Sequence, residues 1–361
     1  MHVFSTLIPA VGLFAHLATA AYKLQDDYGT SDAFFDNFDF FTGTDPTEGY
    51  VDYVDRSTAS QSGLIKASGG SVYIGVDSSN IARSPGRQSV RLSSTKSYTH
   101  GLVILDLEHM PGSICGTWPA FWMLGDNWPS NGEIDIIEGV NQQSTNQVAL
   151  HTTPGCSVND SGFSGSVDTS NCDVEASDQS ANAGCAIVSE NPQSYGDGFN
   201  KVGGGVYATE WTGDAIKIWF FPSASVPSDI SKGSPNPSGW GTPIAAFGGN
   251  CDIDSHFEEL QIMFDITFCG AWAGDVWSTG SCASKSSSCT SYVQNNPSDF
   301  TESYWSVNSL KVYQDGSSSS NVTASAAVGS YASTPLVSTP LVSPTPRPAW
   351  KHRRNGYQHG H

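Results

Sequence analysis

Short apolar runs separated by polar clusters dominate the chain from about Lys23 to Asp315. The clusters are rich in Gly, Ser, Asn, Asp and Pro and recur about every ten residues. Several runs alternate apolar with polar side chains, as strands do when one face lies on a core. The clearest runs are residues 89–93, 102–107, 215–221, 260–266 and 307–313. Because extended helical periodicity is missing, the pattern predicts an all-β sandwich or barrel.

Both ends of the chain differ from this central part. Residues 1–21 carry an apolar stretch followed by Ala18-Thr19-Ala20, a small-residue pattern typical of secretory signal cleavage. The stretch is too short to span a membrane, and no second candidate follows it. Residues 316–361 are rich in Ser, Thr, Pro and Ala and end in basic residues, which predicts a disordered tail. The expected folded domain is therefore residues 22–315 of an exported, soluble protein, either free outside the cell or held at the cell wall.

The chain contains eight cysteines, an even number that fits disulfide pairing in an oxidising compartment. None of them forms a CxxC motif, which argues against zinc ribbons and thioredoxin-type chemistry. The short interval from Cys282 to Cys289 predicts a local bridge between these two residues. Asn159 and Asn321 each begin an N-glycosylation sequon.

The charge of the chain limits its partners. The formal net charge is −19, and residues 316–361 contain Arg347, Lys351, Arg353 and Arg354 but no acid. The negative charge is therefore concentrated in the predicted domain, where it repels phosphate backbones and anionic lipids. We expect no nucleic acid and no membrane as a partner. A neutral polysaccharide is not repelled by this surface.

The run Gly132–Gly139, with the sequence GEIDIIEG, places three carboxylates in an apolar, β-branched segment. Side chains in a regular strand alternate between faces, so Glu133 and Asp135 share one face while Glu138 would point to the other. A β-bulge near Ile136 or Ile137 would return Glu138 to the face of the other two acids. Burying an ionised carboxylate without a partner is costly, so the run predicts a cleft in which the three carboxylates have a function.

The predicted spacing of the acids suggests glycosidase chemistry. With the bulge discounted, the two glutamates lie about four strand positions apart, which is roughly 13 Å between Cα atoms. Side chains that lean together would bring the carboxyls to about 5 Å, the separation found in retaining glycosidases. We assign Glu133 as the nucleophile and Glu138 as the acid/base. Asp135 would hydrogen-bond to one glutamate and raise the pKa of the other.

Other interpretations of the acids remain open from the residues alone. Three carboxylates could bind calcium, although such loops usually run through Gly, Asn and Asp instead of Ile. The strand could also be an exposed edge. A lectin-like binding module, a transglycosylase and a carboxyl peptidase are further alternatives. Neither GxSxG nor HExxH occurs, so serine hydrolase and zinc peptidase chemistry have no support, and we expect no metal and no cofactor.

Aromatic residues lead directly into the acidic run. Sugar rings stack on aromatic faces, so Trp122 and Trp128 are candidate substrate contacts. For Trp118 we expect packing in the core.

The sequence resembles fungal endo-1,3(4)-β-glucanases of the laminarinase type, which belong to glycoside hydrolase family 16. The resemblance covers about residues 22–315. It depends on the segments Asp45–Tyr53, Ser89–Leu92, Trp118–Trp122, Gly132–Asn141 and Ile266–Gly274, with the ExDxxE spacing of the acids typical of the laminarinase branch.

The resemblance implies a concanavalin-like β-jelly-roll sandwich of two curved antiparallel sheets. It also implies hydrolysis, with retention, of internal β-1,3 or mixed β-1,3/1,4 glucan linkages. Separately from the resemblance, we expect a monomer. Glu133, Asp135 and Glu138 match the nucleophile, the assisting aspartate and the acid/base of the family.

Four positions match substrate contacts of the family, namely Arg91, Trp128, His151 and Trp272. Each position is also a candidate substrate contact for an independent reason. Arg91 lies on a polar strand face, and Trp272 lies in a Gly-rich turn. His151 alternates onto the face opposite Leu150, from which it could donate to substrate or to a catalytic acid. The family usually has an acidic residue before Trp272, where this chain has Ala271, so subsite preference is in doubt there.

Overall fold

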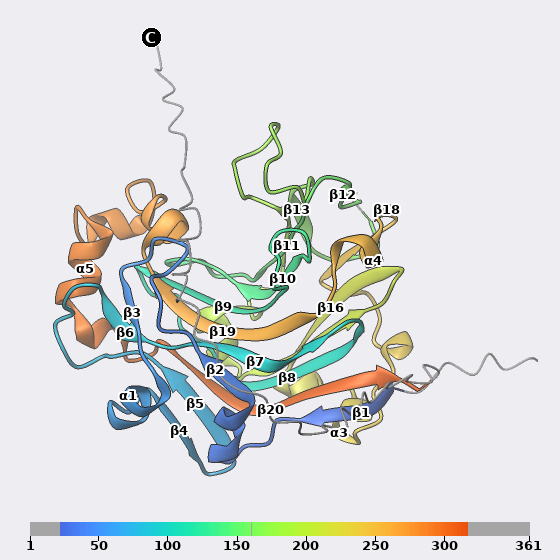
Figure 1. Ribbon diagram of the computed structural model, residues 1–361, viewed down its shortest axis with the longest axis horizontal. Coiled ribbons are helices and arrows are strands. Elements are labelled where there is room, and N and C mark those ends of the chain that lie inside the picture. The colour runs from blue at the N-terminus through green and yellow to red at the C-terminus, as the bar shows by residue number, and fades with distance from the viewer. Residues whose placement is uncertain (1–21, 160, 317–361) are drawn as a thin grey trace, which may run out of the picture. The chain divides into compact units, whose positions relative to one another are not determined.

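The structure is a computed structural model that describes residues 22–159 and 161–316, all of which lie in one compact unit. Two eight-stranded antiparallel sheets pack face to face, with the main hydrophobic core between them (Figure 1). The architecture confirms the predicted all-β sandwich.

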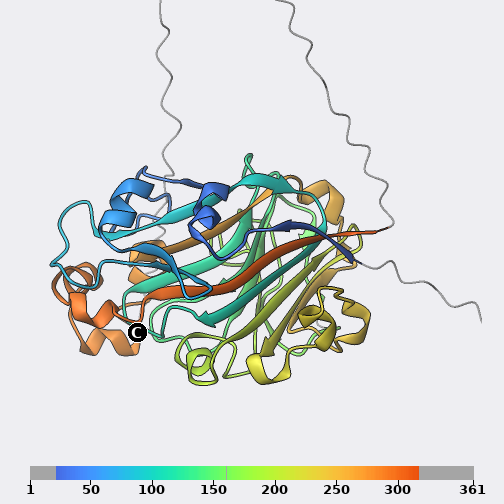
Figure 2. The same ribbon diagram turned by 90° about the horizontal axis from the view of Figure 1, so that it is seen from below.

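The first sheet has the long strand β20 near its centre. Figure 2 shows β20, in red, running beside its neighbours across this sheet. In spatial order the sheet contains β17 (Ala245–Gly248), β16 (Ala215–Pro222), β15 (Gly205–Trp211), β8 (Gly101–His109), β20 (Tyr304–Asp315), β5 (Ser71–Gly75) and β4 (Ile65–Ser68), with β1 (Tyr22–Asp27) also paired to β20.

The second sheet contains the acidic run as one of its central strands. Its order is β13 (Ser166–Thr169), β14 (Cys185–Val188), β11 (Gln147–His151), β10 (Glu133–Glu138), β9 (Thr117–Leu124), β19 (Leu260–Phe268), β7 (Arg91–Tyr98) and β2 (Phe38–Phe40). Two small sheets join β12 (Cys156–Ser157) to β18 (Asn250–Cys251) and β3 (Val51–Tyr53) to β6 (Arg87–Ser89).

Helical segments within the described residues are short and lie in the connections. The α-helices are α1 (Arg56–Gln61), α2 (Gly196–Lys201), α3 (Ser228–Ser231), α4 (Ile253–His256) and α5 (Cys289–Asn295). The other helical turns are η1 (Asp32–Asn37), η2 (Ser223–Ser225), η3 (Pro237–Gly239), η4 (Gly270–Gly274), η5 (Ser281–Ser284) and η6 (Pro297–Phe300). Figure 1 shows β9, β10 and β19 between two groups of raised loops, one near α5 and one near α4.

The apolar pattern of a strand depends on whether one or both faces of its sheet are covered by apolar side chains. In β8, Val103 and Leu105 face the main core, while Leu102 and Ile104 belong to a second apolar cluster on the outer face of the first sheet. A strand covered on both faces reads as a continuous apolar run, which is why residues 102–107 show little alternation. The predicted strand over residues 89–93 is wrong in one detail, because it is divided at Val90 between β6 and β7.

The structure pairs all eight cysteines and corrects the predicted local bridge. Cys282 pairs with Cys115, and Cys289 pairs with Cys269. Both partners lie at the adjoining ends of neighbouring strands β9 and β19, so the loop that carries η5 and α5 is attached to the second sheet instead of closed on itself. The other two bridges are Cys156–Cys251 and Cys172–Cys185.

Some predictions concern residues that the structure does not describe. The signal peptide, almost all of the tail and the Asn321 sequon lie outside the described residues, so the limits of the domain remain a prediction. Asn159 is exposed, and its side chain donates to the Gly248 carbonyl at 3.1 Å. In the described part of the chain, no helix is long and apolar enough to cross a membrane.

Candidate active site

Strand β10 divides its side chains between the core and the opposite face of the second sheet. Ile134, Ile136 and Ile137 are fully buried in the main core. Glu133, Asp135 and Glu138 are instead paired in register with Leu124, Trp122 and Ala120 of β9, which form a separate cluster with Met263 away from that core. We call this surface the acid-bearing face.

A bulge at Ile136 places the third acid on this face, as predicted. The register with β9 shifts between Asp135 and Ile137, and the register with β11 shifts between Asp135 and Glu138. Two consecutive isoleucines therefore enter the core, and Glu138 returns to the side of the other acids. A β-bulge is the expected device for re-aiming a side chain beside an active site.

Glu138 is held by a tryptophan that we expected in the core. The indole Nε1 of Trp118 donates to Glu138 Oε1 at 2.8 Å. Trp118 also meets Trp272 edge to face, with ring centroids 5.6 Å apart. The prediction for Trp118 was wrong because Trp118, Ala120, Trp122 and Leu124 alternate with Phe121 and Met123, and only the latter two face the core. Strict alternation along β9 was the signal that could have revealed this.

Glu133 has different partners from those of Glu138. The indole Nε1 of Trp128 donates to Glu133 Oε2. His151 lies directly across from Glu133 in the register of β10 with β11, and its Nε2 is 3.3 Å from Asp135 Oδ2. Gly184 leaves room for this imidazole, because a Cβ there would lie 2.9 Å from the ring.

Burial and mutual repulsion set the protonation of these groups. Burial and the neighbouring Asp135 carboxylate raise the pKa of Glu138 well above its ordinary value, and the Trp118 N–H opposes the rise. The same two causes raise the pKa of Glu133, where His151, Trp128 and Arg91 oppose them. Burial alone would lower the pKa of His151, but the carboxylates of Glu133 and Asp135 raise it to about 9.

The pKa values of both glutamates are raised, that of Glu133 to about 8, so their neighbours distinguish the two roles. Glu138 retains a proton above the usual range of carboxylic acids, which a general acid needs. Glu133 faces an imidazolium and a guanidinium, which favour its ionised form, and a nucleophile must be ionised.

Arg91 lies on the same face as the acids, within a buried polar group. Its Nη1 is 3.6 Å from Asp265 Oδ2, and its guanidinium lies 4.8 Å from the centroid of Trp122. Tyr53 donates to Asp265 at 3.4 Å. Burial raises the pKa of Asp265 to about 7, although Arg91 opposes the rise. Sequence reasoning missed Asp265, whose signal was an acid inside the apolar run of residues 260–266.

The remaining predicted contacts differ in exposure. Trp122 is 7 % exposed, so it lines the face chiefly beneath Arg91. Trp128 and Trp272 are half-buried. The structure thus gathers every predicted residue on or beside the acid-bearing face, and their substrate roles remain proposals.

One potential metal site falls within the same group. Glu133, Asp135 and His151 each offer a ligand atom, and these atoms lie within 4.8 Å of one another. Asp135 and His151 already form an ion pair, and Glu133 accepts from Trp128. Among the described residues, Asp135 Oδ2 and His151 Nδ1 are nevertheless buried without a hydrogen-bond partner, and the absence of a metal stays a prediction.

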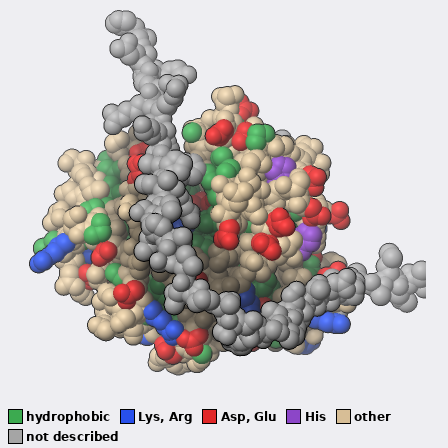
Figure 3. All heavy atoms as spheres, in the orientation of Figure 1, with side chains coloured by type: hydrophobic (Ala, Val, Ile, Leu, Met, Phe, Trp, Pro, Cys, Tyr) green, Lys and Arg blue, Asp and Glu red, His purple; other side chains and the backbone are tan. Residues whose placement is uncertain are grey.

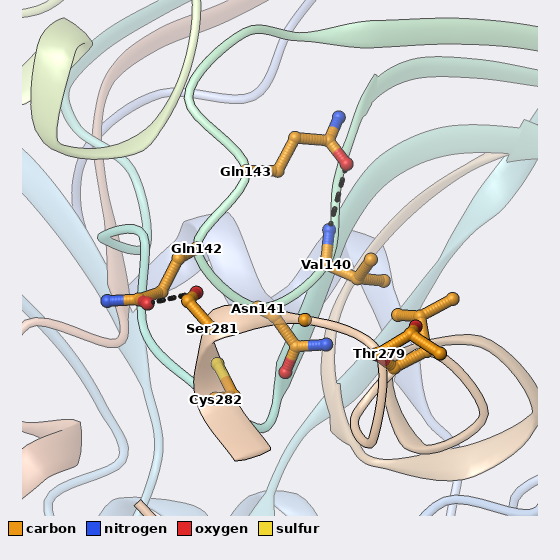
Figure 4. A pocket seen from close by; sticks show the side chains of 9 residues that line it. Val140, Asn141, Gln142, Gln143, Thr279, Ser281 and Cys282 are labelled. Carbon is orange, nitrogen blue, oxygen red and sulfur yellow. Dashed lines mark hydrogen bonds between the residues drawn. The ribbon is translucent and has the colours of Figure 1, made fainter. Parts of the chain in front are cut away.

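A separate shallow pocket of about 230 Å³ lies beyond the end of β10 (Figure 4). Its polar groups largely satisfy one another, since Ser281 donates to Gln142 at 2.5 Å and the Val140 N–H donates to Gln143 at 3.4 Å. None of the three acids lines this pocket.

Comparison with known proteins agrees with this geometry. Residues 38–313 match the family of XgeA-like catalytic GH16 domains. The chain belongs to this glycoside hydrolase family. The predicted resemblance is thereby confirmed, and with it the class of enzyme.

Curated relatives of this family 16 chain come from fungi. An endo-1,3(4)-beta-glucanase from Arthroderma benhamiae is 49% identical over 310 residues, which cover 85% of this chain and 68% of that protein. A probable endo-1,3(4)-beta-glucanase from Aspergillus niger is 46% identical over 343 residues, covering 91% of this chain and 46% of that protein. The chain therefore spans only part of the curated relatives it matches.

Solved structures of the family share the jelly-roll fold. Laminarinase 16A from Phanerochaete chrysosporium, with β-glucans in its donor and acceptor sites, has a TM-score of 0.77 and is 43% identical, covering 82% of this chain and 100% of that one. An elongating GH family 16 beta-1,3-glucosyltransferase has a TM-score of 0.75 and is 46% identical, covering 81% of this chain and 100% of that one.

Proposed function

We propose that this family 16 domain hydrolyses internal β-1,3 and mixed β-1,3/1,4 linkages of glucan by double displacement with retention. The observation that carries the proposal is the bulge in β10, which sets Glu133 and Glu138 on one face with Asp135 between them. The names of the fungal relatives supply the substrate class.

The first step forms a glycosyl-enzyme. Glu138 gives its proton to the glycosidic oxygen while the Glu133 carboxylate attacks the anomeric carbon, so the carbon–oxygen bond to the leaving sugar breaks. In the second step Glu138 takes a proton from water, the water oxygen attacks the same carbon, and the bond to Glu133 breaks. Asp135 and His151 contact each other at 3.3 Å, and through this contact they stabilise the charges of Glu133 and Glu138.

Substrate binding is assigned to residues of the same face. Arg91 and His151 would donate to sugar hydroxyls, while Trp122, Trp128 and Trp272 would contact the apolar faces of sugar rings. On the described surface shown in Figure 3, Asp and Glu side chains are widespread and Lys and Arg are few. Such a surface suits a neutral polymer and repels anionic ones.

A second candidate is transfer of the glycosyl group to another sugar. It is favoured by the similarity to the elongating beta-1,3-glucosyltransferase. Both reactions share the first step and differ only in the acceptor. Incubating the enzyme with laminarin oligosaccharides, with and without added acceptor, and measuring product length would separate them, since a transferase yields products longer than its donor.

We further propose that the enzyme acts outside the cell as a monomer. The four disulfides are of the kind that persist in oxidising compartments. Light scattering of the purified protein and assay of the culture medium test these two points.

Chemical rescue tests the mechanism directly. The Glu138→Ala variant should lose most activity on laminarin and regain turnover of an activated aryl β-laminaribioside when azide is added. Azide replaces water in the second step, so the expected product is a β-glycosyl azide. An α-glycosyl azide would overturn retention, and unchanged activity of this variant would overturn the assignment of Glu138.

A further inference from the structure

Asn146 fills the gap that the bulge opens between β10 and β11. The ladder runs from the Asp135–Ala149 pair directly to the Glu138–Gln147 pair, so two residues of β10 oppose one residue of β11. A bulge of this kind leaves backbone groups without ladder partners. Buried backbone groups need such partners, because leaving them unsatisfied is costly.

The side chain of Asn146 supplies both partners. Its Nδ2 donates to the Ile136 carbonyl at 2.8 Å, and its Oδ1 accepts from the Glu138 N–H at 3.0 Å. Asn146 is fully buried. A carboxamide is suited to this position because it holds a donor and an acceptor on neighbouring atoms.

Asn146 is itself held from a third segment. Its N–H donates to Ser194 Oγ at 3.0 Å, and its carbonyl accepts from the Ser189 N–H at 2.8 Å. Ser194 is also fully buried. The backbone of Asn146 is therefore anchored independently of β10. Its side-chain carboxamide can thus fix the position of β10 instead of moving with that strand.

We propose that Asn146 is a positioning residue that fixes the backbone at Glu138 and thereby aims the acid/base at the leaving oxygen. The inference rests on the proposed function of Glu138. Glu133 and Asp135 precede the bulge and keep regular pairing with β9 and β11, so the nucleophile does not depend on this clamp.

The test compares leaving groups. Laminarin needs proton donation by Glu138, whereas a 2,4-dinitrophenyl β-laminaribioside has a leaving group that departs without it. For Asn146→Ala we expect kcat/KM on laminarin to fall about 10- to 100-fold, since small misplacements of a catalytic group have effects of this size. For the dinitrophenyl substrate we expect a change below about 3-fold, because kcat/KM reports the first step.

A matched control is available at Asn200. Its side chain likewise bridges backbone groups, accepting from the Met110 N–H at 3.0 Å and donating to the Met110 carbonyl at 2.9 Å at the end of β8. Asn200→Ala should lower thermal stability like Asn146→Ala but leave the ratio of the two kcat/KM values unchanged. Equal losses on both substrates for Asn146→Ala, or a changed ratio for Asn200→Ala, would overturn the proposal.

A second variant covers the case in which Asn146→Ala does not fold. Asn146→Asp keeps the shape and the acceptor but loses the donor to Ile136 when ionised. Its laminarin activity relative to wild type should recover as the pH falls and the new carboxyl gains a proton. A ratio that does not vary with pH would contradict the proposed role. If the wild-type protein cleaves neither substrate, the proposed function fails instead.

Discussion

The acid-bearing face and the outer face of the first sheet are both sheet surfaces that point away from the main core. They differ in the side chains that they carry. On the outer face, Trp219 and Trp240 pack with Leu102, Ile104, Val206, Ala208 and Tyr313 into a closed apolar cluster. The acid-bearing face carries acids, a histidine and an arginine at the equivalent alternating positions. Each face lies on the side of its sheet away from the shared core. The difference between them is that apolar side chains cover the outer face, whereas charged side chains cover the acid-bearing face.

The tryptophans show the contrast most clearly. On the outer face, Trp240 Nε1 donates to Asp229 Oδ2 at 2.9 Å, and the same oxygen accepts from the Asn236 N–H, which closes a loop. On the acid-bearing face, Trp118 makes the same type of bond to Glu138 at 2.8 Å. An indole donor next to a carboxylate is therefore not a signature of catalysis. The repulsion from Asp135 and the burial at Glu138 distinguish the second site.

The largest difference should appear when the two carboxylates are neutralised. Glu138→Gln should reduce kcat/KM on laminarin by about 10²- to 10⁴-fold, the usual contribution of a general acid. Asp229→Asn should leave kcat/KM within about 2-fold, because Asp229 lies outside the reaction. Steady-state kinetics on both variants, with circular dichroism to verify folding, measure this. Comparable losses in the two variants would show that the contrast between the faces is not catalytic.

The next contrast concerns two ion pairs of similar length. Arg91 and Asp265 are 3.6 Å apart and almost fully buried, whereas Lys217 and Glu210 are 3.7 Å apart with the lysine side chain 43% exposed. Asp265→Asn should lower the free energy of unfolding by about 3–5 kcal/mol, because a buried guanidinium loses its counter-charge. Glu210→Gln should cost at most about 1 kcal/mol. Urea denaturation decides this, and equal costs would refute the distinction.

A smaller effect is expected from the two indole donors. Trp118→Phe removes a hydrogen bond to an acid, a loss of about 1.5–3 kcal/mol, and should lower kcat/KM by about tenfold or more. Because the Trp118 N–H lowers the pKa of Glu138, its loss should also move the basic limb of the pH profile to higher pH. Trp240→Phe is the control and should change stability but neither kinetic quantity. A basic limb that moves to lower pH would contradict the assigned direction.

The smallest predicted change is a shift in the acidic limb. His151 opposes the rise in the pKa of Glu133, so His151→Gln should raise that pKa further. The nucleophile would then ionise at higher pH, and the acidic limb of kcat/KM should move upward by roughly one unit. His100→Gln serves as control, since His100 pairs with Asp254 away from the acids. An identical shift in both variants would indicate a general charge effect.

Much of the fold and the central part of the site could be predicted because strands have a strict period of two. Glu133, Asp135 and Glu138 interrupt a run of isoleucines, and only a bulge lets all three avoid the core. The same logic was available for Trp118 but was outweighed by the preference of tryptophan for burial. It was also available for Asp265, whose run was recognised only as a strand.

Other features depend on contacts that one sequence does not display. Asn146 matters because it meets backbone groups of β10, and a lone asparagine before a strand carries no pattern. The disulfide partners depend on where β9 and β19 end in space, which the short interval between Cys282 and Cys289 cannot reveal.

The crosslinks have a consequence for producing the enzyme. Two of them attach the loops around α5 to the ends of β9 and β19, and the other two join the segments around β12, β14 and β18. Disulfide bonds thus crosslink the raised loops that border the acid-bearing face, whereas the sheets beneath depend on hydrogen bonds and apolar packing. A bacterial cytoplasm, which keeps thiols reduced, would make the sandwich without secured borders, so a secretory yeast or periplasmic host is the appropriate source of material.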